Sequence, residues 1–476
     1  MDGSPLRLVV VGAGPAGLSA AWENRRRGGT SVVLERDWLV GGIARTVEHN
    51  GCRFDIGGHR FFTKVKEVEE FWHEVLREDF LRVRRESHIL YRGRFFSYPL
   101  RPLEAFFRLG PLESVLCFAS FVKSHLFPRR PEEDFETWVS NRFGWRLYSI
   151  FFRTYTEKVW GVPCTQFRAD WAAQRIRGLS LARALLQAVW KDRTIKTLAD
   201  AFDYPRLGPG QLWEAVQALV EASGSRVLLG RRVERIRWEE GRGVTSVEAA
   251  GDGGAESHSG DAYLSSMPIV DLVAALDPAP PQEVRRAAAA LRYRDFLLVA
   301  LLLEGEGFFT DNWVYVHSPE LRVGRIQNFN NWSKAMVPRE GVTCLGLEYF
   351  CFESDELWTR KDEELVAFAR EELGRTGLVP PGAALHDSAV VRMTKTYPMY
   401  DAGYRENVEV VRRFVEASLP NLQLVGRNGM HRYNNQDHAV VTGMYAVRNL
   451  YGGSHDLWAV NVDDDYHEEV RELRPS

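Results

Sequence analysis

The chain opens with a pattern of hydrophobic positions that predicts a strand, a helix and a second strand. Residues 6–12 (LRLVVVG) are apolar apart from Arg7, which is typical of a buried parallel strand. A glycine-rich turn precedes a helix expected over 16–27, and a second apolar strand is expected over 31–35. This order predicts a βαβ unit at the start of the chain.

Further along, the pattern separates a helical part of the chain from parts rich in strands. Residues from about 65 to 200 show mostly helical spacing and many aromatic side chains. A Gly-Pro-Gly turn at 208–210 precedes another helical pattern, and the alternating segments after it predict strands. We expect helices over 211–222 and 355–374, and strands within 227–238, 244–249, 296–303 and 311–352.

One apolar stretch, from Leu109 to Phe127, raises the question of a membrane helix. It contains Glu113 and Lys123, and it is no longer than a helix of a globular domain. Length and internal charge favour a buried helix of a helical subdomain over a helix that lies on a membrane surface. No integral membrane segment is expected.

The composition excludes several classes of protein. Of the 476 residues, 45% are hydrophobic and 26% are charged, which is typical of a globular protein rather than a disordered or collagen-like one. A net charge of −3 gives no basic surface for nucleic acid. Five scattered cysteines without paired spacing predict neither a disulfide framework nor a metal site, and they indicate a reducing compartment such as the cytoplasm.

The turn after the first strand has the glycine spacing of a dinucleotide-binding motif. Gly12, Gly14 and Gly17 form G-x-G-x-x-G between a strand and a helix. Glycine at these places permits a tight turn, close approach of a pyrophosphate and close helix packing, and the helix N-terminus then faces the phosphates. Glu35 ends the second strand, eighteen residues after Gly17, where a carboxylate can bind a ribose hydroxyl pair. We therefore expect a bound dinucleotide.

A second glycine pair indicates which dinucleotide. Gly41 and Gly42 permit another close backbone approach, and Arg45 supplies a cation for a phosphate or a flavin carbonyl. The order of these motifs is similar to the FAD-binding opening of amine-oxidase and glutathione-reductase-type flavoproteins, although a plain loop would also accept the glycine pair. This interpretation gives a first set of FAD-binding residues: Gly12, Gly14, Pro15, Ala16, Gly17, Glu35, Arg36, Gly41, Gly42, Ile43, Ala44 and Arg45.

Four further motifs extend the resemblance over most of the chain. They are Asp55 to His59 (DIGGH), Tyr98-Pro99, Tyr155 to Pro163 (YTEKVWGVP) and Gly426 to His438 (GRNGMHRYNNQDH). In this order they resemble the UDP-galactopyranose mutases, particularly the longer eukaryotic-type ones, over roughly residues 6 to 450. A related bacterial group of flavin amine-oxidase-like proteins shares the last motif and has other activities.

The resemblance implies an α/β fold. A doubly wound, glutathione-reductase-like FAD-binding domain would carry an inserted helical region and an antiparallel-sheet substrate domain. The FAD-binding domain would be discontinuous, because the dinucleotide turn and the NNQDH motif lie at opposite ends of the chain and both should contact the flavin. We expect its pieces at 6–64, 206–270 and 421–452, a mostly helical substrate region at 65–205, a sheet and helix that roof the flavin at 271–420, and a peripheral tail at 453–476.

The implied reaction is the isomerisation of a nucleotide sugar between its pyranose and furanose forms. In this family reduced FAD uses its N5 atom as a nucleophile on the anomeric carbon, and the nucleoside diphosphate leaves and later recaptures the sugar. No net oxidation occurs. The resemblance implies a UDP-linked substrate and FAD that is active in its reduced form, with NAD(P)H as one candidate electron donor and an oligomer as one candidate assembly.

The family's functional residues map onto positions inside the matching motifs. The resemblance implies that Arg325 and Arg427 bind the diphosphate, since a guanidinium is permanently charged and bidentate, and that His59 responds to the redox state of the flavin. It implies a substrate set of Tyr98, Arg101, Phe151, Tyr155, Thr156, Trp160, Arg175, Trp313, Tyr315, Tyr397, Tyr433 and Asn435. It adds FAD contacts from Gly57, Gly58, His59, Val233, Met267, Gly426, Arg427, Asn435 and Gln436.

Two positions depart from the eukaryotic-type pattern. Arg101 stands where that family has Gln and Thr156 where it has Asn, and both family residues hydrogen-bond to the base. Because Arg cannot accept a hydrogen bond, the base and the sugar of the substrate stay open. Two other functions also stay open: an FAD-dependent oxidase, dehydrogenase or desaturase, and a flavoprotein without catalytic activity. An oxidoreductase would need an electron acceptor, whereas the mutase would not.

Overall fold

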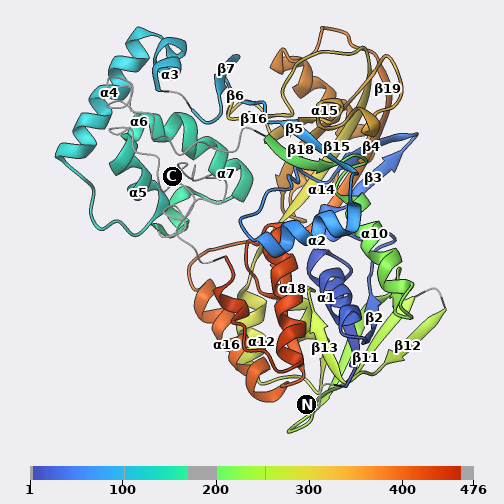
Figure 1. Cartoon of the computed structure of the whole chain (residues 1–476). Helices are drawn as coiled ribbons and strands as arrows, with labels where there is room; N and C mark the ends of the chain where they lie inside the picture. The colour runs from blue at the N-terminus through green and yellow to red at the C-terminus, as the bar shows by residue number, and fades with distance from the viewer. Residues whose placement is uncertain (1–3, 101, 170–200, 252, 462–476) are drawn as a thin grey trace, which may run out of the picture.

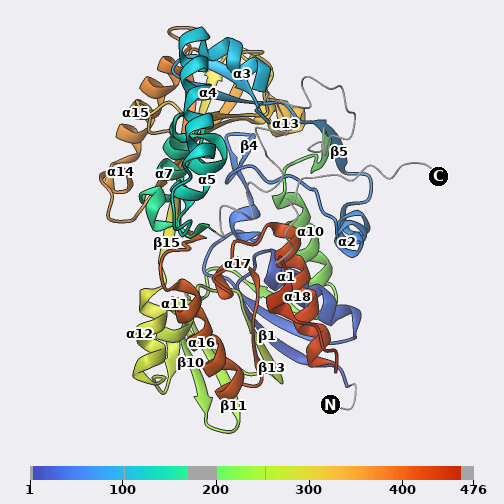
Figure 2. The same cartoon turned by 90° about the vertical axis from the view of Figure 1, so that its left-hand side faces the viewer.

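The computed structural model describes residues 4–100, 102–169, 201–251 and 253–461. Three parts can be followed in Figure 1: a domain with a parallel sheet at the bottom, a second sheet with its helices at the upper right, and a lobe of helices at the upper left. The turned view of Figure 2 shows the second sheet and the helical lobe stacked above the first domain.

A five-stranded parallel sheet forms the core of the lower domain, with the order β20-β13-β1-β2-β9. Its strands come from three distant parts of the sequence: β1 (Arg7–Val11), β2 (Thr30–Leu34), β9 (Arg226–Leu228), β13 (Ala262–Ser265) and β20 (Leu422–Leu424). Next to it lie α1 (Pro15–Arg26), α2 (Lys66–Leu76), α10 (Gly210–Glu221) and α18 (Gln436–Leu450). Helices α1 and α18 approach closely because Gly443 has no Cβ, which would lie 2.2 Å from the Ala16 carbonyl oxygen.

A second, small sheet packs beside this core. It has the order β12-β11-β10-β14 and consists of β10 (Arg232–Glu239), β11 (Gly243–Gly251), β12 (Gly254–His258) and β14 (Leu276–Asp277). Three helices accompany it: α11 (Ile269–Ala275), α12 (Gln282–Ala290) and α16 (Tyr404–Ser418). The hairpin between β11 and β12 agrees with the small, polar stretch that the sequence shows there.

A seven-stranded sheet forms the upper domain, with the order β19-β15-β18-β17-β16-β6-β7. The strands are β6 (Ser87–Tyr91), β7 (Arg94–Ser97), β15 (Tyr293–Glu304), β16 (Trp313–Val316), β17 (Arg325–Asn328), β18 (Val342–Cys351) and β19 (Leu385–Pro398). Strand β15 is an almost continuous apolar run because hydrophobic clusters cover both of its faces. The helices α13 (Phe329–Trp332), α14 (Glu356–Thr359) and α15 (Asp362–Thr376) also belong to this domain. Together with the parallel sheet of the lower domain, it confirms the expected α/β fold.

Part of this sheet comes from the region that the sequence pattern indicates as mostly helical. Strands β6 and β7 form a hairpin around Arg92 and Gly93, both of which have a positive φ, and β6 pairs in parallel with β16. Two further pairs of strands lie outside the large sheets: β3 (Thr46–His49) with β4 (Cys52–Asp55), and β5 (Phe80–Arg84) with β8 (Ala201–Pro205). These strands are short, and charged residues in several of them obscure the alternation of apolar and polar positions by which a strand is recognised in a sequence.

The helical lobe contains α3 (Pro102–Leu109), α4 (Pro111–Leu126), α5 (Phe135–Phe143), α6 (Trp145–Leu147) and α7 (Thr154–Trp160). The expectation of a buried helix over Leu109–Phe127 is wrong for one side of α4. Ser114 and Cys117 are buried, whereas Leu112, Val115 and Leu126 are exposed. Among the helices of the described residues, none combines the length and the apolar character that crossing a bilayer requires.

Candidate active site

The glycines of the first turn are required by their close surroundings. Gly12 has a φ of +99°, and a Cβ there would lie 2.2 Å from the Ser266 hydroxyl oxygen. A Cβ on Gly17 would lie 1.9 Å from the Gly12 carbonyl oxygen, so glycine lets α1 start directly against the turn. Gly14 differs, because its Cβ would meet only the Gly42 Cα at 3.9 Å and would otherwise project into open space. That open space is what a bound pyrophosphate would need.

Glu35 connects the end of β2 to this turn. Its Oε2 accepts a hydrogen bond from the Ala13 N–H at 2.8 Å, and its Oε1 accepts one from the Asp37 N–H at 3.0 Å. Arg36 follows it and donates to the Thr394 hydroxyl at 3.2 Å. The carboxylate of Glu35 therefore stands at the place that the sequence predicts, and it also holds the glycine turn in shape.

The second glycine pair also folds back on the first turn. Gly41 N–H donates to the Ala13 carbonyl oxygen at 2.8 Å, and both Gly41 and Gly42 have a positive φ. Arg45 forms an ion pair with Asp37 and contacts the Met393 sulfur. Its charge is thus compensated within the protein, so Arg45 positions this loop in addition to any contact it makes with a ligand.

A cavity of about 530 Å³ lies along these two turns. Its walls come from the lower domain and from residues near the C-terminal motif. Among the predicted FAD contacts, those that line it are Gly12, Gly14, Pro15, Ala16, Glu35, Arg36, Gly42, Ile43, Ala44, Arg45, His59, Val233, Met267, Gly426, Arg427, Asn435 and Gln436. Gly17, Gly41, Gly57 and Gly58 do not line it.

The Gly57-Gly58 pair makes room for the side chains of the upper sheet. A Cβ on Gly57 would lie 3.5 Å from an Arg325 guanidinium nitrogen, and one on Gly58 would lie 3.0 Å from the Gln327 amide nitrogen. The pair is followed by His59, whose Nε2 lies 3.0 Å from the Ile56 carbonyl oxygen. Burial, together with the charges of Arg427 and Arg325, lowers the pKa of His59 to about 4, so the ring is neutral at pH 7.

Arg325 is held by a buried carboxylate. Its Nε and Nη2 both lie 2.7 Å from Oε2 of Glu348, which is directly opposite it in the β17–β18 register. The other oxygen of Glu348 accepts from the Gln327 amide at 2.8 Å, and Gln327 in turn accepts from the Trp332 ring N–H at 3.1 Å. Burial opposes the positive charge, but Glu348 outweighs it and raises the pKa of Arg325 above its usual value. The guanidinium is therefore fixed in place and always charged.

Arg427 approaches from the other end of the chain, on α17 (Gly426–Gly429). Its guanidinium donates to the carbonyl oxygens of Asn434 at 2.9 Å and Thr396 at 3.3 Å. It also lies over the rings of Tyr433 and Tyr397, at 4.6 and 5.5 Å from their centroids. Unlike Arg325, Arg427 forms no ion pair with any of the described residues, so its charge is available to an anion.

An aromatic wall connects the two arginines. Tyr397 and Tyr433 stack with centroids 5.7 Å apart, and the charges of both Arg325 and Arg427 act on Tyr397. Tyr315 lies opposite Arg325 in the β16–β17 register and packs against Tyr155 at 5.5 Å. Burial raises the pKa of Tyr155 and Tyr397, so both hydroxyls stay protonated and can donate hydrogen bonds.

The remaining substrate residues of the sequence prediction extend this wall. Tyr98 packs on Tyr315 at 4.8 Å, and Trp313 lies 6.3 Å from Tyr315. Trp160 lies 6.2 Å from Tyr397. Phe151 packs on Phe96 at 5.2 Å, in a cluster against which Tyr98 and Tyr315 also pack. Thr156 is buried on α7, and Asn435 begins α18. Arg101 and Arg175 lie outside the described residues.

Four charged residues at this site are not among the predicted ones. Glu348 is the partner of Arg325, and its signal in the sequence is a lone acid within the apolar run of β18. Arg60 lies over the Trp313 ring at 5.1 Å, and Arg85 lies over the Tyr98 ring at 5.2 Å. Lys158, one turn after Tyr155 on α7, donates to three backbone carbonyls at the end of β16 and in the connection to β17. Only the YTEKVWG motif offered a signal for Lys158.

The cavity fits a polar dinucleotide. Both polar atoms of the Gln436 side chain are buried without a hydrogen-bond partner among the described residues, although Gln436 lines the cavity. The Asn428 side-chain oxygen, on the same wall, is also buried without a hydrogen-bond partner among the described residues. A ligand with donors and acceptors would satisfy these atoms. Within the described ranges, no group of His, Cys, Asp or Glu side chains could hold a metal ion.

Comparison with known proteins begins with the cofactor turn. Residues 10–75 match the family model of the NAD(P)-binding Rossmann-like domain. Protoporphyrinogen oxidase 2 of Arabidopsis thaliana is 35% identical over 21% of this chain and 20% of its own length. The 15-cis-phytoene desaturase of Synechococcus elongatus is 25% identical over 56% of this chain and 58% of its own length. The chain thus matches less than two thirds of each of these relatives.

Solved structures resemble the chain over almost its whole length. Reduced UDP-galactopyranose mutase is 23% identical, covers 96% of this chain and 98% of its own, and has a TM-score of 0.84. A putative protoporphyrinogen oxidase from Exiguobacterium is 18% identical over 94% and 99% of the two chains, with a TM-score of 0.71. Putrescine oxidase bound to putrescine is 15% identical over 94% and 99%, with a TM-score of 0.61. The chain therefore shares the fold of these three proteins, and reduced UDP-galactopyranose mutase is a structural neighbour over almost its whole length.

Proposed function

We propose that this chain is an FAD-dependent mutase that interconverts the pyranose and furanose forms of a nucleotide sugar, with the nucleoside diphosphate bound between Arg325 and Arg427. The observation that carries the proposal is the convergence of both arginines on Tyr397, beside His59 and next to the cofactor cavity. The two arginines come from β17 and α17, about 100 residues apart in the sequence. Their meeting at one tyrosine therefore supports a shared role in binding a ligand.

The charges of the site suit a diphosphate. Arg427 offers its full charge, because no described carboxylate pairs with it, whereas the charge of Arg325 is shared with Glu348. Neutral phenols of Tyr155 and Tyr397 add hydrogen-bond donors. As the anomeric bond breaks, negative charge develops on the leaving diphosphate, and donors that are already in position stabilise the transition state more than the ground state.

The cofactor cavity suits FAD. Gly14 leaves space at the start of α1 for the pyrophosphate, Glu35 stands where it can bind the ribose, and Gln436 offers unpaired polar atoms near the start of α18. When bound in its reduced form, FAD would supply the nucleophile for the sugar. The chain's own part is to hold the diphosphate, to exclude water with the aromatic wall, and to keep His59 neutral within reach of the charges of both arginines.

A second candidate is an FAD-dependent oxidoreductase. The match to a phytoene desaturase over 56% of the chain favours it, and so does the compensation of Arg325 by Glu348, which lowers the net positive charge of the site. An apolar or aromatic substrate would fit the wall of Tyr98, Tyr155 and Tyr315 without a diphosphate. Such a reaction would change the redox state of the flavin at every turnover.

An anaerobic assay separates the two functions. The purified protein, reduced with dithionite, is incubated with a panel of UDP-, GDP- and dTDP-sugars, and the products are separated by chromatography. The mutase proposal expects an isomerised sugar nucleotide, with no change in the flavin spectrum after turnover and no product from the oxidised enzyme. Absence of isomer with every sugar, together with reoxidation of the flavin by an organic acceptor substrate, would support the oxidoreductase.

A further inference from the structure

Two adjacent charged residues stand near the start of the otherwise apolar strand β15. Arg294 and Asp295 are both buried, each 5% exposed, whereas Glu304 at the other end of the strand is exposed. A buried charge costs free energy through desolvation unless its neighbours compensate it. Because successive side chains of a strand point to opposite faces, these two charges have different neighbours. The partners of each show what it holds in place.

Arg294 joins the end of helix α7 to the upper sheet. Its Nε donates to the Val159 carbonyl oxygen at 3.2 Å and its Nη2 to the Phe350 carbonyl oxygen at 2.6 Å, and the Asp355 carboxylate lies 3.5 Å from its Nη1. Val159 lies in the last turn of α7, where carbonyl groups lack helical partners and a cation is favourable. Gly161 permits the contact, since a Cβ there would lie 2.5 Å from the guanidinium carbon.

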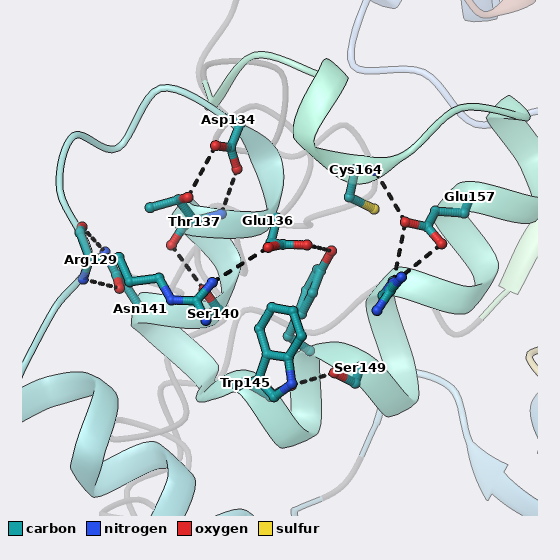
Figure 3. A network of polar contacts seen from close by, with 12 residues as sticks. Arg129, Asp134, Glu136, Thr137, Ser140, Asn141, Trp145, Ser149, Glu157 and Cys164 are labelled. Atoms are coloured by element: carbon teal, nitrogen blue, oxygen red, sulfur yellow. Dashed lines mark hydrogen bonds and ion pairs between the residues drawn. The ribbon is translucent and has the colours of Figure 1, made fainter.

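The outer side of α7 makes a different set of contacts (Figure 3). The Glu157 carboxylate accepts from the Cys164 N–H at 3.3 Å, which links α7 to the segment that follows it. Glu157 also accepts from the Arg153 guanidinium at 3.3 Å, one turn earlier. These contacts stay within the helical lobe, so they do not place α7 on the upper sheet as Arg294 and Lys158 do.

Asp295 holds a bulge in the neighbouring strand β19. Residues 393–397 of β19 stand opposite residues 294–296 of β15, so β19 has two extra residues in what we call the β19 bulge. The Asp295 carboxylate accepts from the Lys395 N–H at 2.7 Å. Lys395 has a φ of +52°, which is uncommon for a residue other than glycine, and its ammonium group pairs with Asp271 at 2.9 Å. The two carboxylates therefore stabilise a strained backbone conformation.

The β19 bulge lies between the cofactor cavity and the aromatic wall. Its residues Met393 and Thr394 line the cavity, and Tyr397 at its end stacks on Tyr433 in the wall. Arg427 donates to the Thr396 carbonyl oxygen inside the bulge at 3.3 Å. Bulges beside active sites change the direction in which a side chain points. The conformation of this bulge therefore decides where Tyr397 stands relative to the cavity.

The two charges of β15 meet at Tyr397. Tyr397 stands opposite Arg294 in the β15–β19 register, and Asp295 holds the bulge that precedes it. Trp160, at the end of α7 that Arg294 holds, lies 6.2 Å from the Tyr397 ring. We propose that Arg294 and Asp295 are positioning residues that fix Trp160 and Tyr397 around the diphosphate. The diphosphate in this inference rests on the proposed function, whereas the positioning rests on these contacts.

Hydrogen exchange read by mass spectrometry tests the positioning without a substrate. In the FAD-loaded protein, Arg294→Met should speed exchange in α7 by about tenfold, because it removes the contact at the end of this helix, and should leave residues 393–397 unchanged. Asp295→Ala should do the reverse. Glu304→Gln, at the exposed end of β15, is the matched control and should change neither segment. A uniform rise over the whole chain in both variants would show a general loss of stability and would overturn the proposal.

Two further measurements connect these positions to function. Arg294→Met should lower kcat/KM for the sugar nucleotide from the anaerobic panel about tenfold or more and leave FAD affinity unchanged, because it displaces Trp160 and not the cavity. Asp295→Ala should lower both kcat/KM and FAD affinity, because Met393 and Thr394 line the cavity. Arg294→Lys and Asp295→Asn keep part of the contacts, so they should retain more activity, and they replace the first pair if it does not fold.

The possible results separate the positioning from the proposed function. Unchanged kcat/KM in Arg294→Met, with faster exchange in α7, would overturn its role in the reaction. Unchanged FAD affinity in Asp295→Ala would overturn the link between the β19 bulge and the cavity. A wild-type chain that isomerises no sugar nucleotide would contradict the proposed function instead. The exchange pattern and the FAD affinities would then still decide whether Arg294 and Asp295 hold α7 and the bulge.

Discussion

Arg325 directs two of its nitrogens, Nε and Nη2, at the same oxygen of Glu348, each at 2.7 Å, and the Glu348 side chain is fully buried. The pair joins the first residue of β17 to the middle of β18, directly across the strand register. A carboxylate in this place costs free energy through desolvation, which the guanidinium offsets. The pair therefore fixes the direction of Arg325 and sets how much of its charge a ligand can use.

Substitution Glu348→Gln tests this pairing. It keeps the size of the side chain but leaves the charge of Arg325 without a buried partner, so we expect the free energy of unfolding to fall by about 1–3 kcal/mol. Chemical denaturation of the purified variant measures this. The matched control is Glu356→Gln, which breaks the solvent-exposed pair with Arg360 and should change stability by less than about 0.5 kcal/mol. Equal losses of unfolding free energy in the two variants would show that burial does not increase the contribution of the Arg325–Glu348 pair to stability.

Substitution Glu35→Ala should weaken FAD binding by about 1–3 kcal/mol, because the proposed site has this carboxylate accept a charge-assisted hydrogen bond from the ribose. Titration of the apoprotein with FAD, followed by flavin fluorescence, gives the affinity. Since Glu35 also accepts from the Ala13 and Asp37 N–H groups, Glu35→Gln should lose less than Glu35→Ala. Unchanged affinity in both variants would place the ribose contact elsewhere.

Asp55 should make stability depend on pH. Burial raises its pKa to about 7, although the hydroxyls of Tyr204 and Thr46 donate to it and lower the pKa in part. The pKa in the unfolded chain is about 3.9, so between about pH 4 and pH 7 the native state binds more protons than the unfolded state. Protonation of Asp55 therefore stabilises the native state, and this contribution to the free energy of unfolding is complete below about pH 4 and is lost as the pH rises through 7. It amounts to at most about 4 kcal/mol.

Comparison with Asp55→Asn isolates this contribution. Buried His59, His317 and His431 have lowered pKa values and act with the opposite sign, since their neutral forms are favoured in the native state. The difference in unfolding free energy between the wild type and Asp55→Asn removes the histidine contribution. We expect the wild type to lose stability relative to the variant from pH 4.5 to 7.5. A difference that does not change with pH would contradict the raised pKa.

Lys158 should act by positioning the strand that carries Arg325. Its ammonium group donates to the carbonyl oxygens of Val316, Ser318 and Val323 at 2.7, 3.1 and 3.1 Å, within the connection from Tyr315 to Arg325. Lys158→Met should lower the unfolding free energy by about 1–3 kcal/mol and reduce turnover without changing FAD content. Lys66→Met, at an exposed surface pair, is the control and should do neither. Wild-type turnover in Lys158→Met would limit its role to stability.

The elements at the start of the chain can be predicted from the sequence because their signals are local. G-x-G-x-x-G, Glu35 and the second glycine pair lie within about 35 residues of one another. Close contacts explain the glycine at Gly12 and Gly17, and hydrogen bonds explain the positions of Glu35 and Gly41. The placement of α1 and of β1 also follows from short-range periodicity. Such features need no knowledge of the rest of the fold.

The positions of the two arginines of the site depend on contacts between residues that are far apart in the sequence. Glu348 and Arg325 meet only through the antiparallel register of β17 and β18, and Arg427 reaches Tyr397 only through the packing of α17 on β19. The hairpin of β6 and β7 and the exposed side of α4 were misjudged for a related reason, because hydrophobicity shows that a side chain is apolar but not which neighbour covers it.

The most direct test of the account is the turnover of Arg325→Ala on the sugar nucleotide that the anaerobic panel identifies. We expect a loss of about 100- to 1000-fold, the usual effect of removing one preorganised donor, with FAD content equal to that of the wild type. Arg325→Lys should also be clearly impaired, because it keeps the charge but loses the two-pronged contact with Glu348. Full turnover in Arg325→Ala would contradict the diphosphate site and favour an oxidoreductase that needs no such site.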